Sequence, residues 1–214
     1  MKLGLPEHGM SRSLWGLLRS PVPPAERTDL LLALVILFLF LLQVATGILL
    51  AFFYQPSPAT VADSVQVIMR DVDWGWVVRG IHHWSAQAIL PLCAFQVARI
   101  LWRGTYRGQG SSSWSLGLLM LLCATLLAYT GELLVWDQAA FWRITRALEQ
   151  VESAPLVGNW IAHVLRGGDE VSATTLSRVF SVHSLLLPWV LGALVVFEGW
   201  FFALRLRGLK EKRA

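Results

Sequence analysis

Charged residues are scarce in this chain, and so are cysteines. Asp, Glu, Lys and Arg make up 15% of the 214 residues and hydrophobic residues 55%, with a mean hydropathy of +0.55. A soluble domain carries roughly 25% charged residues, so the composition excludes a soluble enzyme, a secreted disulfide scaffold and a nucleic-acid-binding protein. Cys93 and Cys123 both lie in long apolar runs, which excludes a disulfide framework and a cysteine-rich metal site. The sequence has no C-x-x-C-H motif, so covalent cofactor attachment through that motif is also excluded.

Long apolar runs are what the chain has in abundance. The first runs from Leu30 to Phe53 without a charge, about 36 Å of helix at roughly 1.5 Å per residue, which is enough to cross a hydrocarbon core of about 30 Å. Three more such runs follow, so we predict an all-α membrane protein built as a four-transmembrane-helix bundle. The transmembrane helices are expected at about 29–54, 76–102, 114–135 and 180–204.

The positive charges are distributed unevenly along this pattern. Twelve of the eighteen Lys and Arg residues lie near the termini or around the short link between the second and third spans. The positive-inside rule then places both termini on the cytoplasmic side of the membrane. We expect this membrane to be the inner membrane of a bacterium. We expect one four-helix domain at 29–207, between an N-terminal arm (1–28) and a basic tail (208–214). Within the arm, residues 10–20 are predicted to form an amphipathic helix at the membrane surface.

Three histidines stand at the outer ends of two spans. His82 and His83 open the second span and His183 opens the fourth. Two facing helices that each offer one imidazole at the same depth can hold a haem iron from both sides. Neighbouring His82 and His83 point about 100° apart on a helix, so only one of them can be a ligand. Arg79 and Arg178 precede the histidines and suit two haem propionates; the alternative is interfacial histidines that bind no metal.

The motifs around these residues resemble the N-terminal half of cytochrome b, most closely the short, split b6 form. They are RGIHHWSA (79–86), QVATG (43–47), WDQ (136–138), FW (141–142) and SRVFSVH (177–183), in one register over about 33–207. The resemblance implies a four-helix bundle with haem between the second and fourth spans and quinol oxidation at the outer side. It also implies a Rieske iron-sulfur protein as electron acceptor.

The resemblance also implies roles for individual residues. His82 and His183 match the axial ligands of the outer, low-potential haem. Gly47 and Gly131 match glycines that let the flat face of the haem approach the first and third spans, since they have no Cβ. The cofactor-binding residues implied are His82, His183, Arg79, Arg178, Gly47, Gly131 and Gln43. The implied quinol-side residues are Trp136, Asp137, Gln138, Phe141 and Trp142.

The pattern breaks in the inner half of the bundle. Family members carry a second histidine about fourteen residues further along each ligand helix, where this chain has Gln96 and Glu198. The inner glycine is Ala33, and the cysteine that holds an extra haem in bf-type relatives is Leu31, although Gly117 is retained. We therefore predict one bis-histidine b-type haem at the outer position and no inner haem. We interpret Gln96 and Glu198 as a polar pair filling the inner site, with a proton path or an inner quinone contact as the alternative.

The outer link departs from the family at two positions. Val135 replaces a proline and Glu132 replaces an aromatic residue. Glu132 is a candidate acceptor of a quinol proton, and a solvent-reaching carboxylate is the alternative.

The sequence therefore predicts a membrane electron-transfer subunit of a quinol-oxidising Rieske/cytochrome b-like complex of the bc or bf type. The expected partners are a C-terminal cytochrome b half or subunit IV-like protein, a Rieske protein, a c-type cytochrome, quinone and lipid, in a dimeric complex. The alternative is a membrane anchor, with or without haem, that docks another oxidoreductase. A channel or transporter is disfavoured because no pair of broken helices or substrate cage is recognisable.

Overall fold

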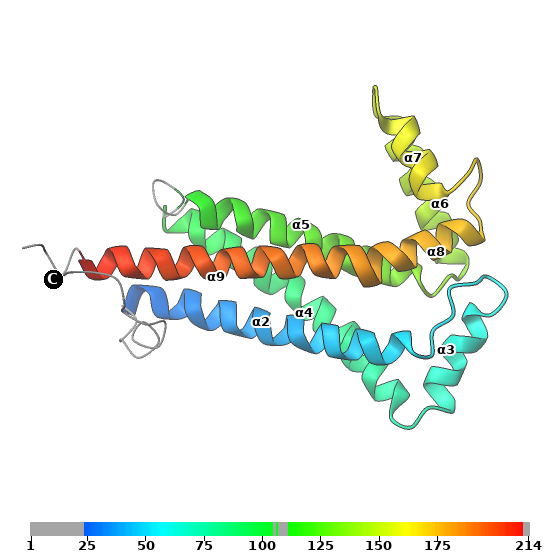
Figure 1. Cartoon of the computed structure of the whole chain (residues 1–214), viewed down its shortest axis with the longest axis horizontal. Helices are drawn as coiled ribbons and strands as arrows, with labels where there is room; N and C mark the ends of the chain where they lie inside the picture. The colour runs from blue at the N-terminus through cyan, green and yellow to red at the C-terminus, as the bar shows by residue number, and fades with distance from the viewer. Residues whose placement is uncertain (1–23, 105, 107–110, 212–214) are drawn as a thin grey trace, which may run out of the picture.

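The fold is an elongated helical bundle with short helices at one end (Figure 1). The computed structural model describes residues 24–104, 106 and 111–211. The amphipathic helix predicted at 10–20, with most of the N-terminal arm, lies outside these residues. We call the end that carries the short helices the outer end, after the orientation predicted from the charges, and the opposite end the inner end.

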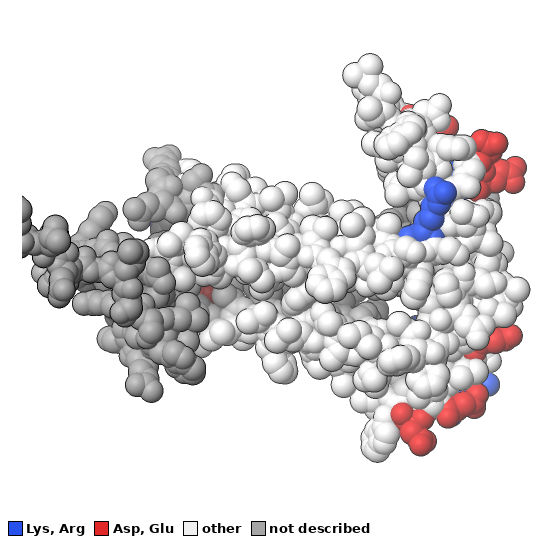
Figure 2. All heavy atoms as spheres, in the orientation of Figure 1, with Lys and Arg blue, Asp and Glu red and all other residues white. Residues whose placement is uncertain are grey.

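Four helices are long and apolar enough to cross a membrane, which confirms the predicted bundle. Three are the continuous helices α2 (Pro24–Ala51), α4 (Gly75–Trp102) and α5 (Ser111–Leu133). The fourth span, Ala173–Leu204, is composite. It consists of α8 (Ala173–Ser181), a π-helical turn (Val182–Leu186) and α9 (Leu187–Glu211). The face of the bundle seen in Figure 2 is almost free of charge, as lipid contact requires.

The fourth span is longer than the sequence indicates. It begins at Ala173 because Ser172 and Thr175 form a capping box, in which each side chain bonds the other's backbone N–H. It continues to Glu211, so the first residues of the predicted basic tail are helical. The π turn ends two residues before Pro188, whose ring nitrogen has no hydrogen to donate to the preceding turn.

Short amphipathic helices make up the two outer links. The first link contains α3 (Val61–Arg70), and the second contains α6 (Gln138–Glu152) and α7 (Gly158–Arg166). Asp137 caps α6, because its Oδ1 accepts the backbone N–H of Ala140 at 2.7 Å. Figure 2 shows Asp and Glu side chains gathered at this end, over α3 and beside α8.

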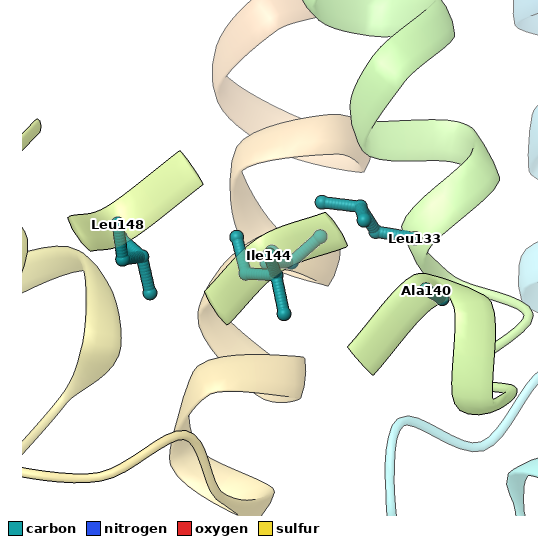
Figure 3. Close-up of a cluster of buried hydrophobic side chains, with 5 residues drawn as sticks. Leu133, Ala140, Ile144 and Leu148 are labelled. Atoms are coloured by element: carbon teal, nitrogen blue, oxygen red, sulfur yellow. The ribbon is translucent and has the colours of Figure 1, made fainter. Parts of the chain in front are cut away.

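Three apolar clusters hold the elements together. The outer cluster fastens α6 to the ends of α5 and α8 (Figure 3). Its members are Leu133, Ala140, Ile144, Leu148 and Val179. Two clusters in the middle of the bundle contain Cys93 and Cys123 respectively, and both cysteines are buried, free thiols. The outer cluster fixes α6 beside the site described next.

Candidate functional site

Two of the histidines at the outer end face each other across the bundle. The ring centres of His82, on α4, and His183, in the π turn, are 6.3 Å apart, with the ring planes at 69°. Two imidazoles that bind one metal ion from opposite sides, each at about 2 Å, have ring centres about 6 Å apart. The separation therefore suits a single metal ion between them. His83 is an exposed residue of α4 that stacks edge-on against Trp84 and also lines the cavity described below.

Each of the two histidines has a threonine partner on a neighbouring helix. Thr46 Oγ1 lies 2.9 Å from His82 Nδ1, and Thr130 Oγ1 lies 3.0 Å from His183 Nδ1. Both hydroxyls donate their hydrogen to a carbonyl one turn earlier in their own helix, at 2.7 Å in each case. A hydroxyl has one hydrogen, so each oxygen accepts from the imidazole Nδ1–H. Both rings are thus held in the tautomer that leaves Nε2 with a lone pair for a metal.

A glycine follows each of these threonines and makes room for the imidazole. A Cβ on Gly47 would lie 3.3 Å from His82 Cε1, and a Cβ on Gly131 would lie 2.9 Å from His183 Cε1. The structure therefore shows two Thr-Gly pairs, on α2 and α5, each supporting one histidine. The glycines are predicted from the sequence and the threonines are not, although the Thr-Gly pair occurs in both spans as a signal.

A mainly apolar cavity of about 750 Å³ surrounds the two rings. This volume lies within the range of cofactor and small-molecule pockets, about 300–1,000 Å³. Both histidines and both glycines line the cavity, together with Gln43 and Arg79. The side-chain amide of Gln43 donates to the His82 carbonyl at 2.6 Å and to Ser85 Oγ at 2.9 Å, which joins α2 to α4 at the level of the ligands.

The two candidate propionate-binding arginines lie in different settings. Arg79 lines the cavity, and its Nη1 donates to Met69 Sδ at 3.6 Å, a weak acceptor. Arg178 is exposed on α8, with its Nε beside Gly167, and does not line this cavity. Neither arginine forms an ion pair with another residue in the described part of the chain.

Glu132 also lines the cavity, directly after Gly131. Its Oε2 lies 2.8 Å from Arg143 Nη1, with the two side chains 44% and 51% exposed. Arg143 belongs to α6 and was not identified from the sequence. The ion pair fastens α6 to the end of α5 at the rim of the cavity.

The five predicted quinol-side residues do not form a single cluster. Asp137 lines the cavity, whereas Gln138 and Trp142 line an open groove of about 600 Å³ on α6. Trp136 and Phe141 pack edge to face, with ring centres 6.3 Å apart. Arg143 lines both the cavity and the groove.

The inner positions that differ from the family lie away from this cavity. Gln96 and Glu198 are half-buried and do not line it. Leu31 and Ala33 are exposed on α2. A Cβ on Gly117 would meet Val97 Cγ2 at 3.3 Å, so this glycine faces an aliphatic side chain. Among the described residues, no group of three or more His, Cys, Asp or Glu side chains is arranged to hold a metal ion.

Comparisons with known proteins agree with this architecture. Residues 20–208 match the Cytochrome b/b6/petB family. Cytochrome b6 from Desmonostoc sp. (strain PCC 7906) and from Synechococcus elongatus are each 33% identical over 188 residues, covering 88% of this chain and 86% of theirs. A chain of a structure titled "Hyperthermophilic respiratory Complex III" superposes with a TM-score of 0.72 at 25% identity. That match covers 88% of this chain and 54% of that chain, so this chain spans about half of its length.

These findings define an integral, multi-pass membrane protein of the electron-transfer class. The chain belongs to the cytochrome b/b6 family. The resemblance drawn from the sequence motifs is thereby confirmed.

Proposed function

We propose that this chain is the electron-transfer subunit of a quinol-oxidising complex of the bc or bf type and carries one b-type haem at its outer end. The observation that carries the proposal is the facing pair His82 and His183, each held in its metal-binding tautomer by a threonine. A b-type haem in this position accepts and passes on single electrons.

Different residues of the cavity would bind different parts of the haem. His82 and His183 would bind the iron through Nε2, and Gly47 and Gly131 keep the space beside the rings open. Arg79 would exchange its weak thioether contact for a haem propionate, a much stronger acceptor. Arg178 would reach a propionate only after a change of side-chain conformation, because it lies outside the cavity.

Two features of the inner half support a single haem. Gln96 and Glu198 occupy the positions where relatives carry histidine, and neither is an ordinary haem ligand. Gly117 faces Val97 rather than an imidazole. A carrier at that level would lie about 21 Å from the outer site, from fourteen residues at roughly 1.5 Å each. We therefore propose that the electron leaves the outer haem on the outer side.

Quinol is the proposed electron donor, at the outer end beside the cavity and the groove on α6. The proposed partners are a C-terminal cytochrome b or subunit IV-like protein, a Rieske protein and a c-type cytochrome. The cytochrome b6 relatives and the fold shared with a respiratory Complex III chain support this assignment. The proposed setting is the bacterial inner membrane, with both termini in the cytoplasm.

Reduction of the haem by quinol tests the proposal and separates it from a membrane-anchor role. A short-chain quinol is mixed with the purified complex, and the haem absorbance is followed with time. We expect rapid reduction in the wild type, no haem signal in His183→Ala, and wild-type behaviour in the control His163→Ala, an exposed residue of α7. A haem that dithionite reduces and quinol does not would overturn quinol oxidation and favour the anchor.

A further inference from the structure

A buried carboxylate holds two arginines at the inner end of the bundle. Asp29, on α2, is 8% exposed. Its Oδ1 accepts from Arg99 Nη2 at 2.8 Å and from Arg99 Nε at 3.1 Å. Its Oδ2 accepts from Arg103 Nη1 at 2.6 Å. Arg99 lies in the last turn of α4 and Arg103 is the C-cap residue that follows it. One carboxylate of α2 therefore joins two long helices at the inner end.

At the outer end of α4, by contrast, the arginine has no carboxylate partner among the described residues. Arg79 lies in its first turns, beside the cavity, and donates to the sulfur of Met69. A thioether accepts hydrogen bonds weakly, whereas a carboxylate between guanidinium groups makes short, charge-assisted bonds. At the outer end, Arg79 can therefore bind an anionic ligand. At the inner end, Arg99 and Arg103 are already bound to the chain's own carboxylate, Asp29.

The spacing along α4 places these cations in equivalent positions. Arg79 lies three residues before His82, and Arg99 lies three residues after Gln96. Residues three apart lie on the same face of a helix, so each arginine flanks one end of the stripe that runs from His82 to Gln96. Arg99 is therefore positioned to bind an acidic group near Gln96, at the inner end of the bundle. The carboxylate of Asp29 already occupies this position.

We propose that Asp29 is an internal counter-ion that occupies the anion-binding position formed by Arg99 and Arg103, so that the inner end of the bundle does not accept an acidic ligand. This inference rests on the proposed single haem and gives a reason for the asymmetry. The outer end accepts the acid groups of a haem, and the inner end is neutralised by the chain itself.

The accessibility of individual arginines tests this inference. Phenylglyoxal, which modifies guanidinium groups, is applied to the purified complex, and each modified arginine is quantified by peptide mass spectrometry. Exposed Arg70 on α3 serves as the internal reference. We expect Asp29→Asn to increase modification of Arg99 and Arg103 about tenfold relative to Arg70, because their charge-assisted bonds are lost. Asp63→Asn, the same change at an exposed acid of α3, leaves both rates at the wild-type level.

Inorganic phosphate is the probe for the anion position. It is expected to slow modification of Arg99 in Asp29→Asn and to have no effect on Arg99 in the wild type. Equal modification of Arg99 and Arg103 in the wild type and Asp29→Asn would overturn the inference. Protection of wild-type Arg99 by phosphate would also overturn it, and that measurement needs no variant that must fold. Haem content is measured on the same samples, so failure of the single-haem proposal is recognised separately.

Discussion

At the scale of single residues, the site depends on two threonines that hydrogen-bond the candidate ligands and are not candidate ligands themselves. Thr46 and Thr130 are not the predicted metal ligands, yet each accepts the Nδ1–H of one histidine and donates its own hydrogen to a carbonyl of its helix. An acceptor at Nδ1 makes the imidazole a better electron donor through Nε2. We therefore propose that the threonines are positioning residues that would also tune the iron of the proposed haem.

Removing one of these acceptors should raise the reduction potential of the haem. In Thr46→Val and Thr130→Val the imidazole donates less electron density, so the oxidised iron is less stabilised. We expect the haem to be retained with a higher midpoint potential in a redox titration, and Thr46→Ser to restore the wild-type value. A potential unchanged in both valine variants would contradict the role assigned to the threonines.

The glycine beside His183 should be intolerant of any side chain. In Gly131→Ala the new Cβ would lie 2.9 Å from His183 Cε1, and overpacking of this kind costs about 1–3 kcal/mol. We expect haem per polypeptide and the melting temperature to fall. Gly80→Ala, in α4, is the matched control because nothing lies within 4 Å of its Cβ position. Equal losses in the two variants would contradict the role of the ring contact, because alanine has the higher helix propensity and only Gly131 faces the ring.

At the scale of elements, Glu132 and Arg143 join α5 to α6 beside the cavity. The pair is about half exposed, and exposed ion pairs contribute about 0–1 kcal/mol. We therefore predict that Glu132→Gln shifts the free energy of unfolding by less than about 1 kcal/mol. The same variant is predicted to leave the rate of haem reduction by quinol unchanged in stopped-flow measurements. Slow reduction in Glu132→Gln that Glu132→Asp restores would instead identify Glu132 as the acceptor of a quinol proton.

Among the elements, the four spans could be predicted from the sequence, whereas the short outer helices and the π turn could not. The four spans follow from apolar runs, because lipid contact demands them over a whole helix. Helices α3, α6 and α7 are short and amphipathic, and they were not predicted from the sequence. Pro188 was visible in the sequence, but the π turn before it, which carries His183, depends on how the fourth span packs.

At the scale of the whole molecule, the contacts that sequence reasoning missed join distant parts of the chain. Asp29 and Arg99 are seventy residues apart, and Thr130 and His183 are fifty-three apart. No local pattern predicts such pairs. The histidines stood out as ionisable residues in apolar spans, and the glycines were identified from the family resemblance. The resulting bundle has its predicted cofactor site at one end only, and the other end is held by its own ion pairs.

The number of haems per polypeptide tests this account most directly. Haem b in the purified complex is measured as the pyridine haemochrome and divided by the amount of this chain, with His82→Ala and His183→Ala measured in parallel. The account predicts one haem in the wild type and none in either variant. Two haems per chain in the wild type, or one that survives both substitutions, would contradict it.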